Sequence, residues 1–296
     1  MKQRFLMQEL ELDEPPEKPT NVASVPQRSP FRYPGGKTWL VPKFRQWMKA
    51  RKSPVPILIE PFAGGGIISL TAAFENLASE IVMAELDEQV AAVWKVIMGG
   101  DAQWLADQIL SFELSADSVR NTLEKKPGSL REKAFQTLLK NRTAHGGILA
   151  NGAGIIKNGE NGKGLRSRWY PATIAKRIQA IESVASKVRF IHGDGFDIME
   201  QYKKRTDTVF FIDPPYTAGG KRAGSRLYRH FEVDHERLFA LCKESRGDFL
   251  MTYDNANEVQ QLANKYRFET KLVSMKNTHH AKMDELLVGK NLAWLV

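Results

Sequence analysis

The stretch TVFFIDPPY, which spans Thr208–Tyr216, joins a short apolar run to an abrupt end made of Asp213 and two prolines. Residues 209–212 are strong β-formers, and such a run is typical of a strand buried on both faces of a parallel sheet. Consecutive prolines each fix their own φ and donate no backbone hydrogen bond, so the chain leaves the sheet along one rigid path. The pattern places a carboxylate and an aromatic ring at the carboxyl end of a strand, where open α/β sheets bind ligands. Taken alone, it would also fit a proline turn with a capping aspartate.

A glycine-rich turn follows another short strand. The segment PILIE, residues 56–60, runs directly into PFAGGG, residues 61–66, and a helix is predicted for Ile67–Leu77. In a strand, glycine turn and helix of this kind, backbone N–H groups and a helix N-terminus approach a ligand closely. We therefore assign Phe62, Gly64 and Gly66 to a cofactor site. The spacing differs from G-x-G-x-x-G, which disfavours a dinucleotide pyrophosphate.

The next predicted strand, Ile81–Ala84, ends at Glu85. An acidic residue about twenty positions after a glycine turn, at the tip of the following strand, suits a ribose diol. Asp87 competes for this role but fits better as the N-cap of a helix over Glu88–Met98. The glycine turn and the acidic strand tip together predict a cofactor that contains adenosine.

Two further segments resemble ligand-binding turns. Residues 31–37, FRYPGGK, combine aromatic and basic residues with a Pro-Gly-Gly turn before a helix predicted for Thr38–Arg51, although a simple helix entry is the alternative. After a strand at Val188–Ile191, the sequence HGDGF contains Asp194, which could accept a hydrogen bond from an adenine amino group while Phe196 packs on the ring. Asp194 could equally do no more than cap a helix over Asp197–Lys203.

From Gly99 to Ser186 the strands stop, and helices are predicted for Ala102–Ser111, Asp117–Lys125 and Leu130–Ala144. We interpret this segment as an insertion in an α/β domain formed by residues 29–98 and 187–296. Residues 140–177 hold eight Lys or Arg against one acid and many glycines. Such a segment suits an element that orders on a phosphate backbone and reaches into a groove, although a solvated loop is the alternative. Candidate DNA contacts here are Asn141, Arg142, Arg166 and Arg168.

After TVFFIDPPY, residues 217–231 hold four basic residues and no acid. This basic loop, which includes Lys221 and Arg222, suits a polyanionic substrate or a lid. Alternation then resumes, with helices predicted for Asp234–Ser245 and Asn255–Lys265, and strands for Asp248–Thr252, Phe268–Val273 and Glu285–Val288. His279 and His280 have no partners at metal-ligand spacing, so we expect no metal site.

The net charge of +9 is unevenly placed, because residues 1–27 carry −2 and the rest of the chain +11. This pattern indicates a flexible acidic leader over residues 1–28 and a basic body with a polyanionic partner. Cys242 is the only cysteine, which excludes an intramolecular disulfide and fits a reducing, cytoplasmic setting. No apolar run is long enough to span a bilayer. No motif sets the oligomeric state, and a monomer is favoured.

The chemistry follows from what the motifs contain and lack. They supply no nucleophile elbow, hydride-cofactor fingerprint or metal cage. S-adenosylmethionine needs none of these, because its positive sulfur already activates the methyl group and the protein need only align an acceptor. Asp213 and the carbonyl of Pro214 could accept both hydrogens of an aromatic amine, while Tyr216 stacks on a base that has left the helix.

Seven segments in this order resemble the Dam-like class of DNA adenine-N6 methyltransferases: FRYPGGK, PFAGGG, AELD, KNRTAHGGIL, HGDGF, FIDPPY and DELLVG. The resemblance runs from about Pro30 to Val296. It implies a Rossmann-like, mostly parallel α/β sheet with an antiparallel last strand, S-adenosylmethionine as cofactor, double-stranded DNA as substrate and residues 99–186 as the target-recognition domain.

The resemblance also implies roles for single residues. Tyr33, Lys37, Glu85 and Asp213 fall on cofactor-contacting positions, and Asp194 on an adenine contact. The catalytic motif falls on Asp213, Pro214 and Tyr216, and Arg32 stands where some relatives touch DNA. Glu85 replaces the Asp of many relatives but keeps the carboxylate. The recognition loop does not resemble that of the GATC-specific members, so no target sequence is implied.

Two kinds of alternative remain open. One is an amino-methyltransferase with another acceptor, such as adenine in RNA, N4 of cytosine or a protein amide, because related enzymes share the motif. The other is a nucleic-acid-binding protein that keeps the fold without catalysis, which the presence of Asp213 and Tyr216 disfavours.

Overall fold

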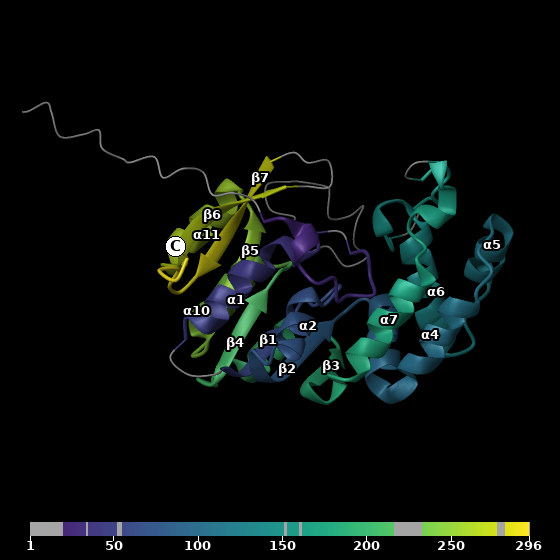
Figure 1. The fold of residues 1–296 in the computed structure, drawn as a ribbon. Coiled ribbons are helices and arrows are strands. Elements are labelled where there is room, and N and C mark those ends of the chain that lie inside the picture. The colour runs from purple at the N-terminus through teal and green to yellow at the C-terminus, as the bar shows by residue number, and fades with distance from the viewer. Residues whose placement is uncertain are drawn as a thin grey trace, which may run out of the picture.

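A computed structural model describes residues 20–33, 35–51, 55–150, 153–159, 162–215, 233–276 and 282–295 (Figure 1). These residues contain a seven-stranded sheet with the order β3-β2-β1-β4-β5-β7-β6. The strands are β1 (Val55–Glu60), β2 (Ala78–Glu85), β3 (Val188–His192), β4 (Thr208–Ile212), β5 (Asp248–Asp254), β6 (Glu269–Lys276) and β7 (Lys282–Gly289). Strands β1 to β5 pair in parallel, and β7 runs antiparallel to both of its neighbours. The predicted sheet with an antiparallel last strand is confirmed.

Strand β4 is central, and all five of its residues are buried. Phe211 faces one side of the sheet, where its ring packs edge-on against Phe44 at 6.0 Å between centroids. Phe210 belongs to a second hydrophobic cluster, which also holds Phe239. Because both faces of β4 are covered, the strand is apolar without alternation, as the sequence predicted.

Helices cover the two faces of the sheet. On one face lie α1 (Val41–Lys49), α2 (Ile67–Phe74) and α3 (Glu88–Val96), whose apolar residues share one cluster. The other face carries α8 (Gly195–Tyr202), α10 (His235–Glu244) and α11 (Asn257–Tyr266). In Figure 1, α1 and α2 lie over the near face of the sheet. The helix predicted from Thr38 begins with a 3-10 turn, η2 (Lys37–Leu40), before α1.

The helical segment between β2 and β3 stands beside the β3 edge of the sheet (Figure 1). It contains α4 (Ala102–Ser111), α5 (Ala116–Glu124), α6 (Leu130–Thr143) and α7 (Pro171–Glu182). Sequence analysis missed α7, because the glycine-rich stretch before it suggested an extended loop. Its signal was present: Pro171 occupies the first turn, and Ile174, Ile178 and Ile181 are buried at helical spacing.

The inserted helices share their core with the sheet domain. Trp94 and Ile97 belong to the same hydrophobic cluster as Leu105, Leu138 and Ile178. A π-helical segment, Ile97–Asp101, joins α3 to α4, with Gly100 at φ +90°. The predicted division at residue 99 falls beside Gly100, where the backbone leaves the helical conformation, and it stays a prediction. None of the helices in the described ranges is long and apolar enough to cross a membrane.

Candidate functional site

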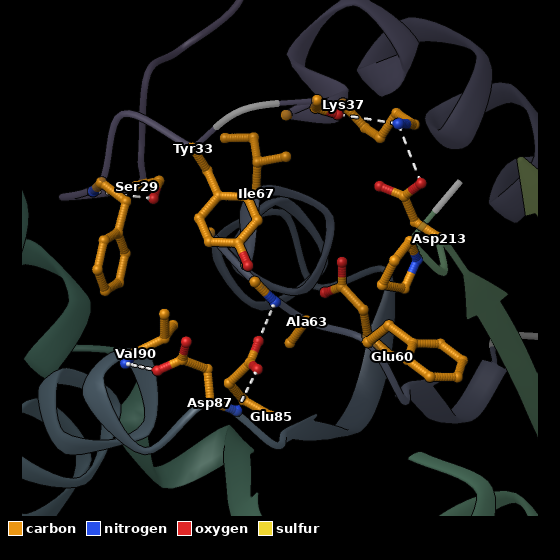
Figure 2. Close-up of a pocket in the computed structure, with 18 of the residues that line it drawn as sticks. Ser29, Tyr33, Lys37, Glu60, Ala63, Ile67, Glu85, Asp87, Val90 and Asp213 are labelled. Carbon is orange, nitrogen blue, oxygen red and sulfur yellow. Dashed lines mark hydrogen bonds and ion pairs between the residues drawn. The ribbon is translucent and has the colours of Figure 1, made fainter. Parts of the chain in front are cut away.

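A cavity of about 690 Å³ opens at the carboxyl ends of the central strands. Three strand tips supply carboxylates to its wall: Glu60 ends β1, Glu85 ends β2 and Asp213 follows β4. Figure 2 shows these three side chains around Tyr33. Side chains from separate strand tips therefore line one cavity, at the edge of the sheet where open α/β sheets bind ligands.

Asp213 is held by two contacts to one of its carboxylate oxygens. Lys37 Nζ lies 3.0 Å from Asp213 Oδ1, and the hydroxyl of Thr252 on β5 donates to the same atom at 2.9 Å. The Asp213 side chain is 22% exposed, toward the cavity. Its direction is thus fixed by neighbours from two other parts of the chain, as suits a group that must meet a reacting atom.

Lys37 is buried, with only 3% of its side chain exposed. Besides Asp213, its ammonium donates to the carbonyl of Gly35 at 2.8 Å and lies 3.7 Å from Glu285 Oε2 on β7. The resemblance implied that Lys37 contacts the cofactor. The structure places its charge between two carboxylates, next to the predicted catalytic aspartate.

Glu85 is fixed by backbone N–H groups. Gly64 N donates to one oxygen and Asp87 N to the other, each at 2.8 Å (Figure 2). Desolvation raises the pKa of Glu85 to about 7, against the effect of these hydrogen bonds. Asp87 caps α3 by accepting from Gln89 N at 2.7 Å, which confirms the role predicted for it.

The glycine turn adopts a conformation that favours glycine. Gly64 and Gly66 have φ of +48° and +64°. A Cβ on Gly66 would lie 2.7 Å from the methyl of Met83 and 2.9 Å from the Trp94 ring, whose indole N–H donates to Gly64 O at 2.9 Å. Tyr33 packs across the other side of the turn, close to Gly64. The ring contacts and the absence of side chains leave the backbone of this glycine turn as part of the cavity wall.

Glu60 is a site residue that sequence analysis missed. It is 3% exposed, and its Oε2 accepts from Ser69 N at 3.0 Å. Burial, reinforced by the charges of Asp213 and Glu85, raises the pKa of Glu60 to about 8. The signal was available, because Glu60 ends the PILIE strand directly before the glycine turn, as Glu85 ends the next strand.

The remaining predicted cofactor residues lie on the same cavity wall. Asp194 caps α8 by accepting from Phe196 N at 2.9 Å, and it also lines the cavity. The rings of Phe62 and Phe196 pack edge to face at 6.0 Å between centroids. A role as helix cap and a role as adenine contact are therefore compatible for Asp194, because the capping residue also lines the cavity.

The predicted DNA contacts lie in different environments. Asn141 is completely buried: it accepts from Arg32 N at 2.8 Å and donates to the carbonyls of Arg32 at 3.0 Å and Gly147 at 2.7 Å. Arg142 is 7% exposed and donates to Pro30 O. Among the other candidates, Arg32 and Arg168 are half-buried on the cavity wall and Arg166 is exposed. Tyr216, Lys221, Arg222, His279 and His280 lie outside the described residues.

The strand-tip end of the cavity suits a ligand that carries positive charge and hydroxyl groups. Two desolvated carboxylates there have raised pKa values, and a nearby cation would relieve the cost of ionising them. A carboxylate such as Glu85 has further acceptor sites beyond the two backbone contacts, which suit ribose hydroxyls. The residues therefore fit the S-adenosylmethionine expected from the sequence.

Other reactive groups in the described ranges do not form a site. No three His, Cys, Asp or Glu side chains there are placed to hold a metal ion. Cys242 is buried, and desolvation raises the pKa of its thiol far above the ordinary value, so the thiolate is not available as a nucleophile.

A family model matches most of the chain. The model of the family described as D12 class N6 adenine-specific DNA methyltransferase matches residues 33–280. No curated protein matches the sequence.

Solved structures with a similar chain path share little sequence with this one. The rRNA methyltransferase aviRa from Streptomyces viridochromogenes is 13% identical, with a TM-score of 0.39 and coverage of 88% of this chain and 87% of that chain. An rRNA methylase from Streptococcus thermophilus is 8% identical, with a TM-score of 0.35 and coverage of 83% and 92%. Precorrin 8w decarboxylase from Methanobacterium thermoautotrophicum is 7% identical, with a TM-score of 0.37 and coverage of 88% and 94%. These likenesses carry no argument about the substrate.

Proposed function

Because the chain belongs to the D12 class N6 adenine-specific DNA methyltransferase family, we propose that it methylates N6 of an adenine that has left duplex DNA, by direct in-line transfer. Membership makes it an S-adenosylmethionine-dependent adenine methyltransferase. The flipped base, the roles of single residues and the recognition of a specific site are the proposal. The observation that carries it is that Asp213, at the tip of β4, shares one cavity with Glu60, Glu85 and the glycine turn.

In this mechanism Asp213 binds the amine of the target base. Its Oδ1 already accepts from Lys37 and Thr252, and its Oδ2 accepts one N6 hydrogen while the carbonyl of Pro214 accepts the other. Acceptance of both hydrogens keeps the nitrogen lone pair available and stabilises the positive charge that develops on nitrogen. Tyr216, by its place in the motif, stacks on the extruded base.

Lys37 and Thr252 act as positioning residues for that carboxylate. The buried ammonium of Lys37 neutralises the charge that Asp213 and Glu285 would otherwise present to each other. The Thr252 hydroxyl fixes the rotation of the Asp213 carboxylate through its single donor hydrogen. A carboxylate held in this way meets the amine without reorganisation, which is how pre-organised acceptors lower a barrier.

The other strand tips hold the cofactor. S-adenosylmethionine, when bound, supplies a methyl group activated by a positively charged sulfur. Glu85 would accept from the ribose hydroxyls, Phe62 and Phe196 would pack against the adenine, and Asp194 would accept from its amino group. Glu60, buried beside the glycine turn, would ionise and balance the charge only when the cationic part of the cofactor lies beside it.

DNA contacts come from residues on the cavity rim and on the inserted helices. We propose that Arg32, Arg166 and Arg168 contact DNA, as do Lys221 and Arg222, and that residues 99–186 supply target recognition. For Asn141 and Arg142 the hydrogen bonds favour an additional role, because both side chains anchor the 30–32 backbone to α6. They thus position Arg32 at the cavity.

The experiment incubates the protein with methyl-labelled S-adenosylmethionine and duplex DNA, then digests the DNA to nucleosides. We expect label in N6-methyladenine alone. Label in N4-methylcytosine, or in parallel reactions in RNA or protein but not DNA, would overturn the assignment. Binding to DNA without transfer to any acceptor would favour a non-catalytic protein of the same fold.

A further inference from the structure

Four arginines lie near one another on the cavity wall, since the charges of three of them lower the pKa of the fourth. We call Arg32, Arg142, Arg168 and Arg177 the arginine cluster; all four line the cavity. Arg142 lies in the last turn of α6 and Arg177 lies on α7, so two members come from the inserted helices. Arg32 comes from the segment before the first helix of the sheet domain, and the cluster therefore spans the junction of insertion and sheet.

Three members, Arg32, Arg142 and Arg177, have no carboxylate among the described residues to balance their charge. Arg142 donates to Pro30 O and Arg177 donates to Ser29 O at 3.1 Å, and both acceptors are neutral carbonyls. Among the described residues, no carboxylate lies within ion-pair distance of Arg32, Arg142 or Arg177. Carbonyl acceptors satisfy hydrogen bonds, but they do not cancel a buried positive charge.

The positive charges of the cluster lower the pKa values of some of its members. Burial, together with the charges of Arg177, Arg32 and Arg168, lowers the pKa of Arg142 to about 10. Burial and the charge of Arg168 also lower the pKa of Arg32. Guanidinium groups stay protonated at neutral pH, so an anion that joins Arg32, Arg142 and Arg177 would relieve the cost of burying their charge.

We propose that the arginine cluster binds a phosphodiester group of the substrate strand next to the target adenosine. The proposal rests on the proposed function, since it takes the nucleotide that enters the cavity to be part of DNA. The planar fork of arginine suits the non-bridging oxygens of a phosphate, and the cluster presents several such forks at one place.

The charge distribution of the cavity favours this occupant. The carboxylates Glu60, Glu85 and Asp213 lie at strand tips, whereas the cluster members Arg142, Arg168 and Arg177 belong to the insertion. An extruded nucleotide has the matching polarity, because its base offers amino hydrogens and its backbone carries a negative phosphate. The carboxylate of the cofactor is the other oxyanion that could reach the cluster, and the experiment separates the two.

The test uses the full-length protein and a short duplex that contains its methylation site, identified by sequencing DNA from a host that expresses it. A series of duplexes replaces one phosphate at a time by an uncharged methylphosphonate. For the unaltered protein, we expect neutralisation of a phosphate adjacent to the target adenosine to weaken binding roughly tenfold to a hundredfold, as for the loss of charged hydrogen bonds. This measurement needs no variant and so cannot be confused with misfolding.

The second arm compares the double variant Arg32→Gln, Arg168→Gln with the unaltered protein. In the variant, the same methylphosphonate should cost little, and the slope of log affinity against log salt should decrease by about 0.9 for one lost phosphate contact. Arg120→Gln is the matched control, because it removes one charge from an exposed position on α5. Thermal unfolding checks that each variant is folded.

The outcomes separate the possibilities. Equal losses with the adjacent methylphosphonate in variant and unaltered protein, or an unchanged salt slope, would overturn the proposal. A weaker affinity for S-adenosylmethionine alone, with DNA binding unchanged, would assign the cluster to the carboxylate of the cofactor. A protein that methylates adenine but does not respond to adjacent methylphosphonates keeps the proposed function and loses only this inference.

Discussion

The buried Lys37 and the half-buried Asp213 form an ion pair, with 3.0 Å between Nζ and Oδ1, that joins the turn before α1 to the tip of β4. Glu285 on β7 lies 3.7 Å from the same ammonium, and Thr252 on β5 donates to the same carboxylate oxygen. The predicted catalytic carboxylate is therefore held by two other parts of the chain, and β7 is linked to it through the shared ammonium. Its position depends on the whole sheet and on the N-terminal turn packed against it.

Asp213→Asn should abolish most methyl transfer while it leaves cofactor binding nearly intact. The amide keeps the size of the side chain but replaces one acceptor oxygen by a donor and removes the charge that stabilises the developing positive nitrogen. We expect turnover to decrease roughly a hundredfold or more. Turnover is measured with labelled cofactor, and cofactor affinity by calorimetry. Near-normal turnover would remove Asp213 from the mechanism.

Lys37→Met should destabilise the protein, because it leaves Asp213 and Glu285 without their shared cation in a poorly solvated place. Loss of one partner of a buried pair costs roughly 3–5 kcal/mol in the free energy of unfolding, and the 22% exposure of Asp213 favours the lower end of this range. The measurement is urea unfolding at neutral pH. Lys133→Met is the control: its ion pair with Glu88 is more exposed, so we expect a loss below about 1 kcal/mol. Equal losses of unfolding free energy in the two variants would contradict the view that burial of Lys37 strengthens its contribution to stability.

Glu60→Gln should flatten the dependence of stability on pH. The pKa of Glu60 is raised to about 8 from an ordinary 4.5, so between these values the folded protein keeps a proton that the unfolded chain has lost. Stability from this group is fully present below pH 4.5 and decreases as the pH rises toward 8, by up to about 1.4 kcal/mol per pH unit.

The Gln variant stays neutral, so its free energy of unfolding should decrease less from pH 5 to pH 8 than that of the unaltered protein. Urea unfolding at a series of pH values measures both curves. Glu85, whose pKa is raised to about 7, adds a dependence of the same sign that remains in the variant. Parallel curves for the two proteins would contradict the buried, protonated state of Glu60.

Gly66→Ala should destabilise the protein and weaken cofactor binding. Gly66 has φ +64°, and a Cβ there would overlap Met83 and Trp94. The left-handed backbone alone costs about 1–2 kcal/mol for a residue with a Cβ. Gly99→Ala is the matched control, since a Cβ at Gly99 meets no atom within 4 Å. Thermal unfolding and calorimetry measure the two effects, and equal behaviour of the variants would contradict this account of the turn.

Asn141→Ala should lower the free energy of unfolding. We expect any loss of DNA affinity to follow from this destabilisation. The variant leaves the N–H and carbonyl of Arg32 and the carbonyl of Gly147 without their partner in a buried place, at a cost of roughly 2–4 kcal/mol. Asn121→Ala, on the exposed face of α5, should change little. An Asn141→Ala protein of full stability and weakened DNA affinity would instead support the direct DNA contact predicted from sequence.

Local signals predicted most of the fold, and they pointed to several residues that line one cavity in the structure. Short apolar runs, prolines and glycine turns lie within a few residues of each other, so Asp213, Glu85 and the glycine turn could be identified one segment at a time. The same rule applied to Glu60 would have found the remaining strand-tip carboxylate. Helix α7 was missed because the composition of the preceding loop outweighed a regular apolar spacing.

The sequence by itself determined the order of strands and helices, the carboxylates that end the strands, and the family, because each depends on contiguous residues. Only the tertiary structure decided that Lys37 pairs with Asp213, that Asn141 is buried against Arg32, and that Arg177 joins three other arginines at the cavity. Burial and charge pairing are sums over neighbours that are distant in sequence, and no local pattern of residue types contains them.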